Sequence, residues 1–290
     1  MTVWPLLAIG AAGLQVVRNA SQRSLTERLG LWGATYIRFL YGLPFALLWS
    51  AVILYLYGPS GSPSWSFAGW VFLGATTQIA GTAALIIAMR TRAFAVTTAL
   101  LKTEVLGSAV IGFVLIGDRL SAGDWLGASI GTVGVLLMAH VSVDRSALSA
   151  AFAGAGSGIL FAFTAVGYRA AALAWGGEPW IGAAAALSST LTLQTLMGGV
   201  FMYFHDRVAL RGVFTAWRPS LIPGGAGSIS SALLLTAFAT GPSVAAVKTV
   251  QLVDVLIAWA VSRHMFREKV APWEIAGAAL VVIGATAVLL

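Results

Sequence analysis

The sequence contains no cysteine and few charged residues for its length. Without cysteine it can form no disulfide, thiol nucleophile or thiolate metal site. Charged residues make up 9% of the 290 residues and hydrophobic residues 59%. A typical soluble domain is about 25% charged. This composition indicates a membrane protein without a soluble domain.

Other features that mark common classes of protein are also missing. The net charge of +7 is spread along the chain without a basic tail, so we expect no nucleic-acid partner. The three histidines, His140, His205 and His264, lack the spacing of metal ligands, and we expect no metal and no cofactor. The opening MTVWPLLAIG has no basic start typical of a signal peptide, and we expect it to begin the first span.

Apolar runs of about 20 residues recur along the whole chain, and each is long enough to cross a hydrocarbon core. Turn signals such as GPSGSPS at 58–64 separate these runs. The pattern predicts an all-α integral membrane protein with ten transmembrane helices. The expected spans are 3–19, 32–57, 66–89, 93–116, 122–140, 149–171, 180–204, 219–240, 243–264 and 272–290.

The chain also repeats itself at a spacing of 150 residues. Under this shift 74–139 aligns with 224–289 without a gap, and acidic residues align with acidic residues. The acidic pairs are Glu104/Asp254, Asp118/Glu268 and Asp124/Glu274. We therefore expect two repeats, 1–145 and 146–290, with five helices each. Since five is odd, the second repeat must enter the bilayer in the opposite sense, which predicts an inverted repeat around a central cavity.

The positive charges fall mostly on one side of this topology. Twelve of the 17 lysines and arginines lie in loops of the same side, whereas only Arg119 and Arg169 fall on the other. The positive-inside rule then places both termini outside the cytoplasm. We expect a multi-pass protein of a bacterial inner membrane.

Four charged residues lie inside the expected fourth and ninth spans: Lys102, Glu104, Lys248 and Asp254. Each would cost about 2.5–3.5 kcal/mol at mid-bilayer if it faced lipid. Two interpretations remain open. The four groups can form buried ion pairs across helices, or they can line a cavity that binds a substrate. Lys102 and Glu104 point about 200° apart on a helix, so we expect them to serve different neighbours.

In the cavity interpretation each group has an expected role. Lys102 and Lys248 would bind a carboxylate or phosphate of the substrate, while Glu104 and Asp254 would couple transport to protons or contact a substrate amine. The remaining candidate substrate contacts are Gln78, Gln251 and Thr98. Glycines spaced at 127, 131 and 134, and at 277 and 284, predict close helix packing in the fifth and tenth spans.

Two segments and one dipeptide resemble the drug/metabolite transporter superfamily, in its ten-span form with two EamA-like repeats. They are GDRLSAGDWLGASIGTVGVLLM at 117–138, FREKVAPWEIAGAALVVIGATAVLL at 266–290, and Arg38-Phe39. The resemblance implies a basket of helices around a central cavity and alternating access of the two halves. Its members carry amino acids, other metabolites, drugs, nucleotide sugars or sugar phosphates. The prolines that many members have near 104–105 and 254–255 are absent here.

These observations together predict a secondary active transporter. The expected substrate is a small polar metabolite, an amino acid or another carboxylate- or phosphate-bearing compound, and the expected direction is export. Protons are the expected coupling ion, the bilayer the surrounding partner, and the protein a monomer or homodimer. The alternative is an exporter of drugs or lipophilic cations that is proton-coupled through Glu104 and Asp254. No enzyme is expected, since no span places a serine near a histidine in mid-membrane and no GxGD motif is present.

Overall fold

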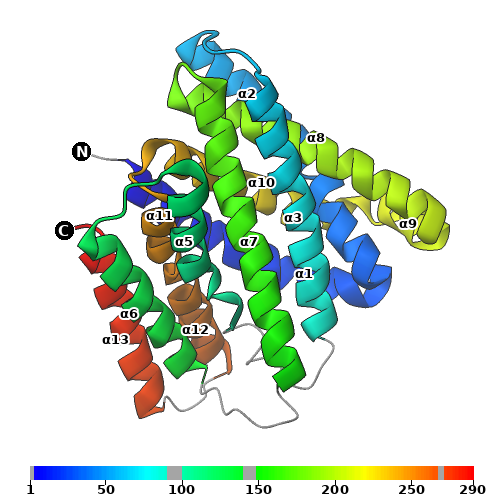
Figure 1. Ribbon diagram of the computed structural model, residues 1–290. Helices are drawn as coiled ribbons and strands as arrows, with labels where there is room; N and C mark the ends of the chain where they lie inside the picture. Colours follow the sequence, from blue (N-terminus) through cyan, green and yellow to red (C-terminus); the bar gives the residue numbers. More distant parts are fainter. Residues whose placement is uncertain (1–2, 90–99, 140–147, 267–270) are drawn as a thin grey trace.

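A computed structural model describes residues 3–89, 100–139, 148–266 and 271–290. These residues form α-helices joined by short turns, and no strand occurs among them (Figure 1). Within them, five helical segments are long and apolar enough to cross a membrane: Arg28–Tyr57, Phe152–Trp175, Pro179–His205, Trp217–Thr240 and Val244–His264. The fold is thus all-α, and it is compatible with a multi-pass membrane protein.

The helices largely coincide with the apolar runs of the sequence. Their bounds are α1 Trp4–Leu40, α2 Leu43–Tyr57, α3 Trp65–Met89, α5 Glu104–Ile116, α6 Ala122–Met138, α7 Leu148–Trp175, α8 Pro179–His205, α9 Arg207–Thr215, α10 Trp217–Thr240, α11 Val244–Gln251, α12 Val253–Phe266 and α13 Pro272–Ala287. At about 1.5 Å per residue, helices as short as α5 do not cross a 30 Å core alone. The first half of the expected span 93–116 lies mostly outside the described residues.

The sequence predicted a loop between the first two spans, and this prediction is wrong. Helix α1 continues through the expected loop, and only Gly30 leaves helical geometry, with φ of 66° and ψ of −174°. Glycine reaches this region without a steric penalty, so one residue is enough to redirect the chain. The side chain of Gln22 ties the two arms together by donating to the carbonyl of Ala34 at 2.7 Å.

Three pairs of helices lie side by side, and the main hydrophobic core lies among α1, α3, α7, α8, α10 and α11. Helix α1 packs along α10, α3 along α7, and α6 along α13, and Figure 1 shows the last two pairs clearly. Phe39, Leu187 and Phe238 are among the largest side chains in this core, each no more than 2% exposed. The interior is closely packed with apolar side chains. The buried polar residues are exceptions within it.

Two helix interruptions occur at matching positions, although neither contains a proline. Before α5 the amide of Val105 donates to the carbonyl of Lys102 at 3.2 Å, and between α11 and α12 that of Val255 donates to Leu252 at 3.0 Å. Both bonds span three residues and belong to tight turns. The two bonds are related by a shift of 150 residues. The interruptions therefore follow the same spacing as the sequence repeat.

Helices α6 and α13 cross with their backbones nearly in contact. A Cβ atom added to Gly127 would lie 2.5 Å from the carbonyl oxygen of Gly284, and one added to Gly134 would lie 2.7 Å from that of Gly277. The early residue of one helix therefore faces the late residue of the other, so the two helices run antiparallel. The close packing expected from the glycine spacing is confirmed.

Substitution of Gly134 by alanine is expected to lower the free energy of unfolding by about 1–3 kcal/mol, because the crowded crossing has no room for a methyl group. The added Cβ would lie 2.9 Å from both Leu280 Cβ and the Val281 amide nitrogen. Chemical denaturation in detergent measures the change. Gly156→Ala in α7 is the matched control, since a Cβ there meets nothing within 4 Å. Equal stability of the two variants would contradict this account of the crossing.

Candidate functional site

The four charged residues of the expected fourth and ninth spans form two ion pairs. Lys102 Nζ donates to Asp254 Oδ2 at 2.7 Å and to Oδ1 at 3.0 Å. Lys248 Nζ donates to Glu104 Oε1 at 3.4 Å. The side chains retain 8–12% of their exposed area in the first pair and 10% in the second. Each pair joins a residue of the first sequence repeat to a residue of the second.

The helix interruptions explain why the carboxylates sit where they do. Glu104 is the first residue of α5, and Asp254 is in the first turn of α12. The amide groups at a helix N-terminus carry a partial positive charge, which stabilises a nearby carboxylate. Each carboxylate is therefore held by a helix end from its own repeat and by a lysine from the other.

Two glutamines extend the first pair into a network. Gln15 of α1 donates through Nε2 to Asp254 Oδ2 at 3.1 Å, and Gln251 of α11 donates to Gln15 Oε1 at 3.3 Å. Gln251 thus reaches the carboxylate through Gln15 and not directly. Hydrogen bonds of this kind fix the orientation of a charged group in a medium of low dielectric constant.

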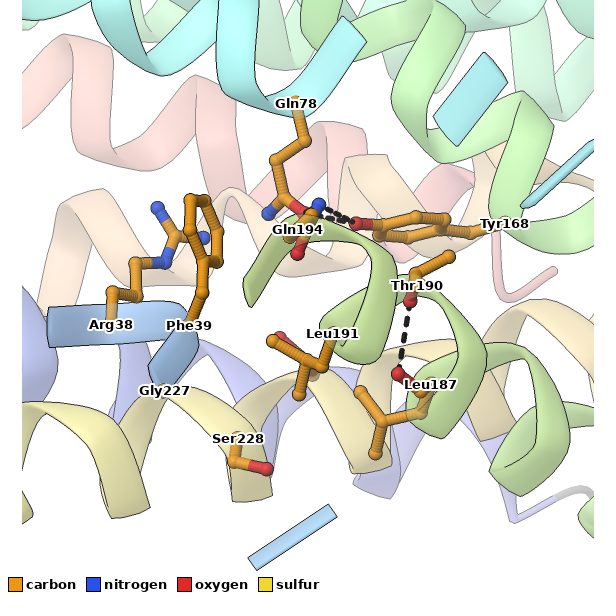
Figure 2. A pocket seen from close by; sticks show the side chains of 11 residues that line it. Arg38, Phe39, Gln78, Tyr168, Leu187, Thr190, Leu191, Gln194, Gly227 and Ser228 are labelled. Atoms are coloured by element: carbon orange, nitrogen blue, oxygen red, sulfur yellow. Dashed lines mark hydrogen bonds between the residues drawn. The ribbon is translucent and has the colours of Figure 1, made fainter. Parts of the chain in front are cut away.

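A second polar group lies between α1, α3, α7, α8 and α10. Tyr168 and Gln194 both donate to Oε1 of Gln78, Gln194 at 2.6 Å. Figure 2 shows these three side chains converging, with Arg38 and Phe39 on the other side of the view. They line a cavity of about 10 Å³, which is room for one water molecule. Gln78 therefore belongs to this cavity and not to the lysine pairs.

A larger and almost wholly apolar cavity lies beside the polar one. It has a volume of about 320 Å³, within the range of small-molecule pockets. Its walls come from α1, α3 and α8, and include Trp32, Tyr36, Phe39, Ile79, Phe201 and Met202. Phe39 lines both cavities. Its ring therefore forms part of the wall between the polar and the apolar space.

The structure brings some of the predicted site residues together and separates others. Lys102, Glu104, Lys248 and Asp254 form one cluster, with Gln251 at its edge, while Gln78 belongs to the polar cavity. Neither cavity includes any of the four charged residues in its lining. Thr98 lies outside the described residues. Within 3–89, 100–139, 148–266 and 271–290, no group of three His, Cys, Asp or Glu could hold a metal ion.

Arg169 has a role that the sequence did not indicate. The loop-charge count placed it in a loop, but it is buried in α7 and its Nε donates to Asp118 Oδ1 at 2.9 Å. Its other nitrogens donate to carbonyls at the end of α10 and in the following turn, those of Phe238, Gly241 and Pro242. Asp118 Oδ2 also accepts the amide of Val244 at 2.8 Å. This Arg169–Asp118 latch ties the start of α11 to α7.

The polar cavity was also missed, except for Gln78 and the Arg38-Phe39 resemblance. Gln194 stands in the apolar run LTLQTLM, and Ser228 lies in the small-residue stretch GGAGS of α10. A lone glutamine inside an apolar run is the signal that could have indicated Gln194. Pro223 lies inside α10, and the next residue, Gly224, packs against the backbone of Tyr41.

Comparison with known proteins finds the fold but no family. No family model matches the chain, and no curated protein matches it. One solved structure, described only as "Crystal structure of protein", superposes with a TM-score of 0.70 at 14% sequence identity. The superposition covers 100% of this chain and 99% of that one. At this identity the likeness shows a common fold and nothing about activity.

Proposed function

We propose that the protein is a secondary active transporter of a small polar metabolite, of the ten-span drug/metabolite transporter type. The observation that carries the proposal is the pair of cross-repeat contacts, Lys102 with Asp254 and Lys248 with Glu104, at two helix interruptions. Ionisable groups inside a membrane protein are costly, and they mark substrate or ion pathways by default. Interrupted helices at mid-membrane are typical of transporter binding sites.

The two-fold arrangement supports an inverted repeat with halves 1–145 and 146–290. Helices α6 and α13 correspond under the 150-residue shift and cross antiparallel. Equivalent helices of opposite direction are what an inverted repeat requires. Ten crossings, both termini outside, and a bacterial inner membrane complete the proposed topology.

The ion pairs suggest how binding is coupled to a change of shape. Breaking a buried pair without compensation costs about 3–5 kcal/mol. A substrate carboxylate or phosphate at the lysines, and a proton at Glu104 or Asp254, would each replace a lost partner. The two halves then separate at this point only when these ligands are bound, which is the requirement for alternating access. Export in exchange for protons is the proposed direction.

The test is counterflow of a labelled metabolite in liposomes. The metabolite is chosen by thermal shift from amino acids, carboxylic acids and sugar phosphates, since binding stabilises the native state. Lys102→Ala and Lys248→Ala are each expected to reduce counterflow by at least about tenfold, equivalent to 1.4 kcal/mol. Both variants should still insert and elute as a single species.

Arg207→Gln on α9 is the matched control, because it removes an exposed positive charge far from any ion pair described above. Its counterflow should equal that of the wild-type protein. Wild-type rates in both lysine variants would refute the role of the pairs, and no counterflow of any metabolite by the wild-type protein would refute the transporter itself.

A second candidate function is export of lipophilic cations. The observation that favours it is the apolar cavity of about 320 Å³ with Trp32, Tyr36 and Phe201 in its wall. Aromatic faces attract cations, and an apolar wall suits a lipophilic one. If this function is correct, transport of tetraphenylphosphonium should be lost in Asp254→Asn and kept in Lys248→Ala. A metabolite transporter should instead lose transport in Lys248→Ala.

A further inference from the structure

Two arginines of α1 lack the carboxylate partners that both lysines have. Arg38 has no hydrogen bond or ion pair in the described part of the chain, while Arg18 donates to its neighbour Asn19 Oδ1 at 2.8 and 3.1 Å. A Cβ added to Gly227 of α10 would lie 2.9 Å from Arg18 Cδ and 3.9 Å from Arg38 Cγ. Both arginines therefore pass the same point of α10.

Two polar atoms without partners belong to residues that line the same cavity as Arg38. Ser228 Oγ and Gln194 Oε1 are buried and have no hydrogen-bond partner, although the residues are only 3% and 0% exposed. The amide of Gln194 is oriented by three acceptors within hydrogen-bond distance of its Nε2: Gln78 Oε1, the Ala75 carbonyl and the Tyr168 hydroxyl. Leaving such groups unpaired costs about 1–3 kcal/mol each. All three side chains line the polar cavity.

The charges of this interior do not balance. Arg18, Arg38, Lys102 and Lys248 are cationic, and the described carboxylates paired with them are Glu104 and Asp254. The lysines use both carboxylates, so the arginines carry the excess positive charge. A carboxylate at Arg38 would reduce this excess by one charge and would also give Ser228 a partner.

We propose that Arg38 binds the carboxylate of an organic anion with an apolar body, and that Ser228 donates a second hydrogen bond to it. This deepens the proposed function, on which it rests: Arg38 is a further contact for the anionic part of the substrate, in addition to the lysines of the two ion pairs. The body of the substrate occupies the apolar cavity on the other side of Phe39.

The two cavities differ in what they can hold. The polar cavity, about 10 Å³, has room for one water molecule, so a carboxylate enters only when that water leaves and the side chains around it move, whereas the apolar cavity of about 320 Å³ admits a ring or chain. Phe39 belongs to both walls and is 2% exposed, so its ring must move for one molecule to occupy both. A guanidinium presents two parallel donors, which match the two oxygens of a carboxylate.

The test measures binding and not transport. Wild-type protein in phosphatidylcholine nanodiscs is titrated with phenylacetate and with its neutral isostere phenylacetamide, and the melting temperature is followed. Phenylacetate is expected to raise it and phenylacetamide is not. Arg38→Gln should weaken phenylacetate binding by at least about tenfold. Arg38→Lys and Ser228→Ala should weaken it by a smaller factor. Arg211→Gln, which removes an exposed guanidinium of α9, should bind as the wild-type protein does.

Each outcome decides the proposal. Wild-type affinity in Arg38→Gln, equal binding of the amide, or no binding at millimolar phenylacetate overturns it. If Arg38→Gln does not fold, Ser228→Ala and Phe39→Ala test the site instead. Ser228→Ala should weaken phenylacetate binding, and Phe39→Ala should change its affinity by widening the passage between the two cavities. Displacement of phenylacetate by phosphatidylglycerol would assign Arg38 to a lipid headgroup and overturn a metabolite site. Binding without any transport would leave this site intact and refute the proposed function.

Discussion

Replacing Arg169 by alanine is expected to lower the free energy of unfolding by about 3–5 kcal/mol, since one member of a buried ion pair is removed. The variant leaves Asp118 buried and charged, and it also removes the donors to the carbonyls of Phe238, Gly241 and Pro242. The turn between α10 and α11 then loses its link to α7. Arg169→Lys keeps the charge but not the planar fork, and its loss should be intermediate.

Unfolding of the detergent-solubilised protein, followed by tryptophan fluorescence, measures this effect. Arg211→Gln serves as control because it also removes a guanidinium, but from an exposed position on α9. The latch has no proposed contact with substrate, so binding of phenylacetate by the folded Arg169→Lys variant should be unchanged. A melting temperature for Arg169→Ala equal to that of the control would show that the latch contributes no stability.

The second large effect is expected in the Lys102–Asp254 pair. Lys102→Leu leaves the buried carboxylate of Asp254 without its lysine, and Asp254→Leu leaves the buried ammonium of Lys102 without its carboxylate. Each variant should therefore lose about 3–5 kcal/mol of unfolding free energy. The double variant should recover most of this loss, because replacing a whole buried pair by apolar residues is often neutral. Transport should be lost in all three variants, since the compensating ligand sites are gone.

A double-mutant cycle on unfolding free energies checks this pair, and the interaction energy between the two positions is its result. Gln15 also contacts Asp254, at 3.1 Å, and Gln15→Leu measures its share. Additive losses in the double variant would mean that the two charges are not coupled in the folded protein. Recovery of stability together with recovery of transport would mean that the pair is structural only.

The sequence alone predicted the character of the fold and part of the site. Apolar runs placed most helices within a few residues, because a long run of apolar side chains marks a helix by its composition and length. The spacing of 150 residues indicated the positions of Glu104 and Asp254. Which lysine meets which carboxylate could not be predicted, because the pairing depends on helix interruptions without a proline to mark them. Nor did the sequence mark Gly30 as the only non-helical residue of α1.

The polar cavity is the part that sequence reasoning reached least. Its polar residues come from five helices, and most stand among apolar or small neighbours in the sequence. Such residues can equally be helix contacts, as Ser50 is with Ser188 across α2 and α8. Only the structure shows that Gln194 and Ser228, which keep unpaired atoms, line the same cavity as Arg38. Proximity of groups from distant segments is a tertiary property, which no local pattern encodes.

The lysines, unlike the carboxylates, do not obey the repeat. Shifted by 150 residues, Lys102 falls on Leu252 and Lys248 falls on Thr98. If transport proceeds by an exchange of conformations between the halves, the inward-open and outward-open forms cannot be mirror images at this point. They would differ in free energy and in affinity for an anion. Such a carrier would have different affinities and maximal rates on its two sides, because the two lysine positions have no lysine counterpart in the other repeat.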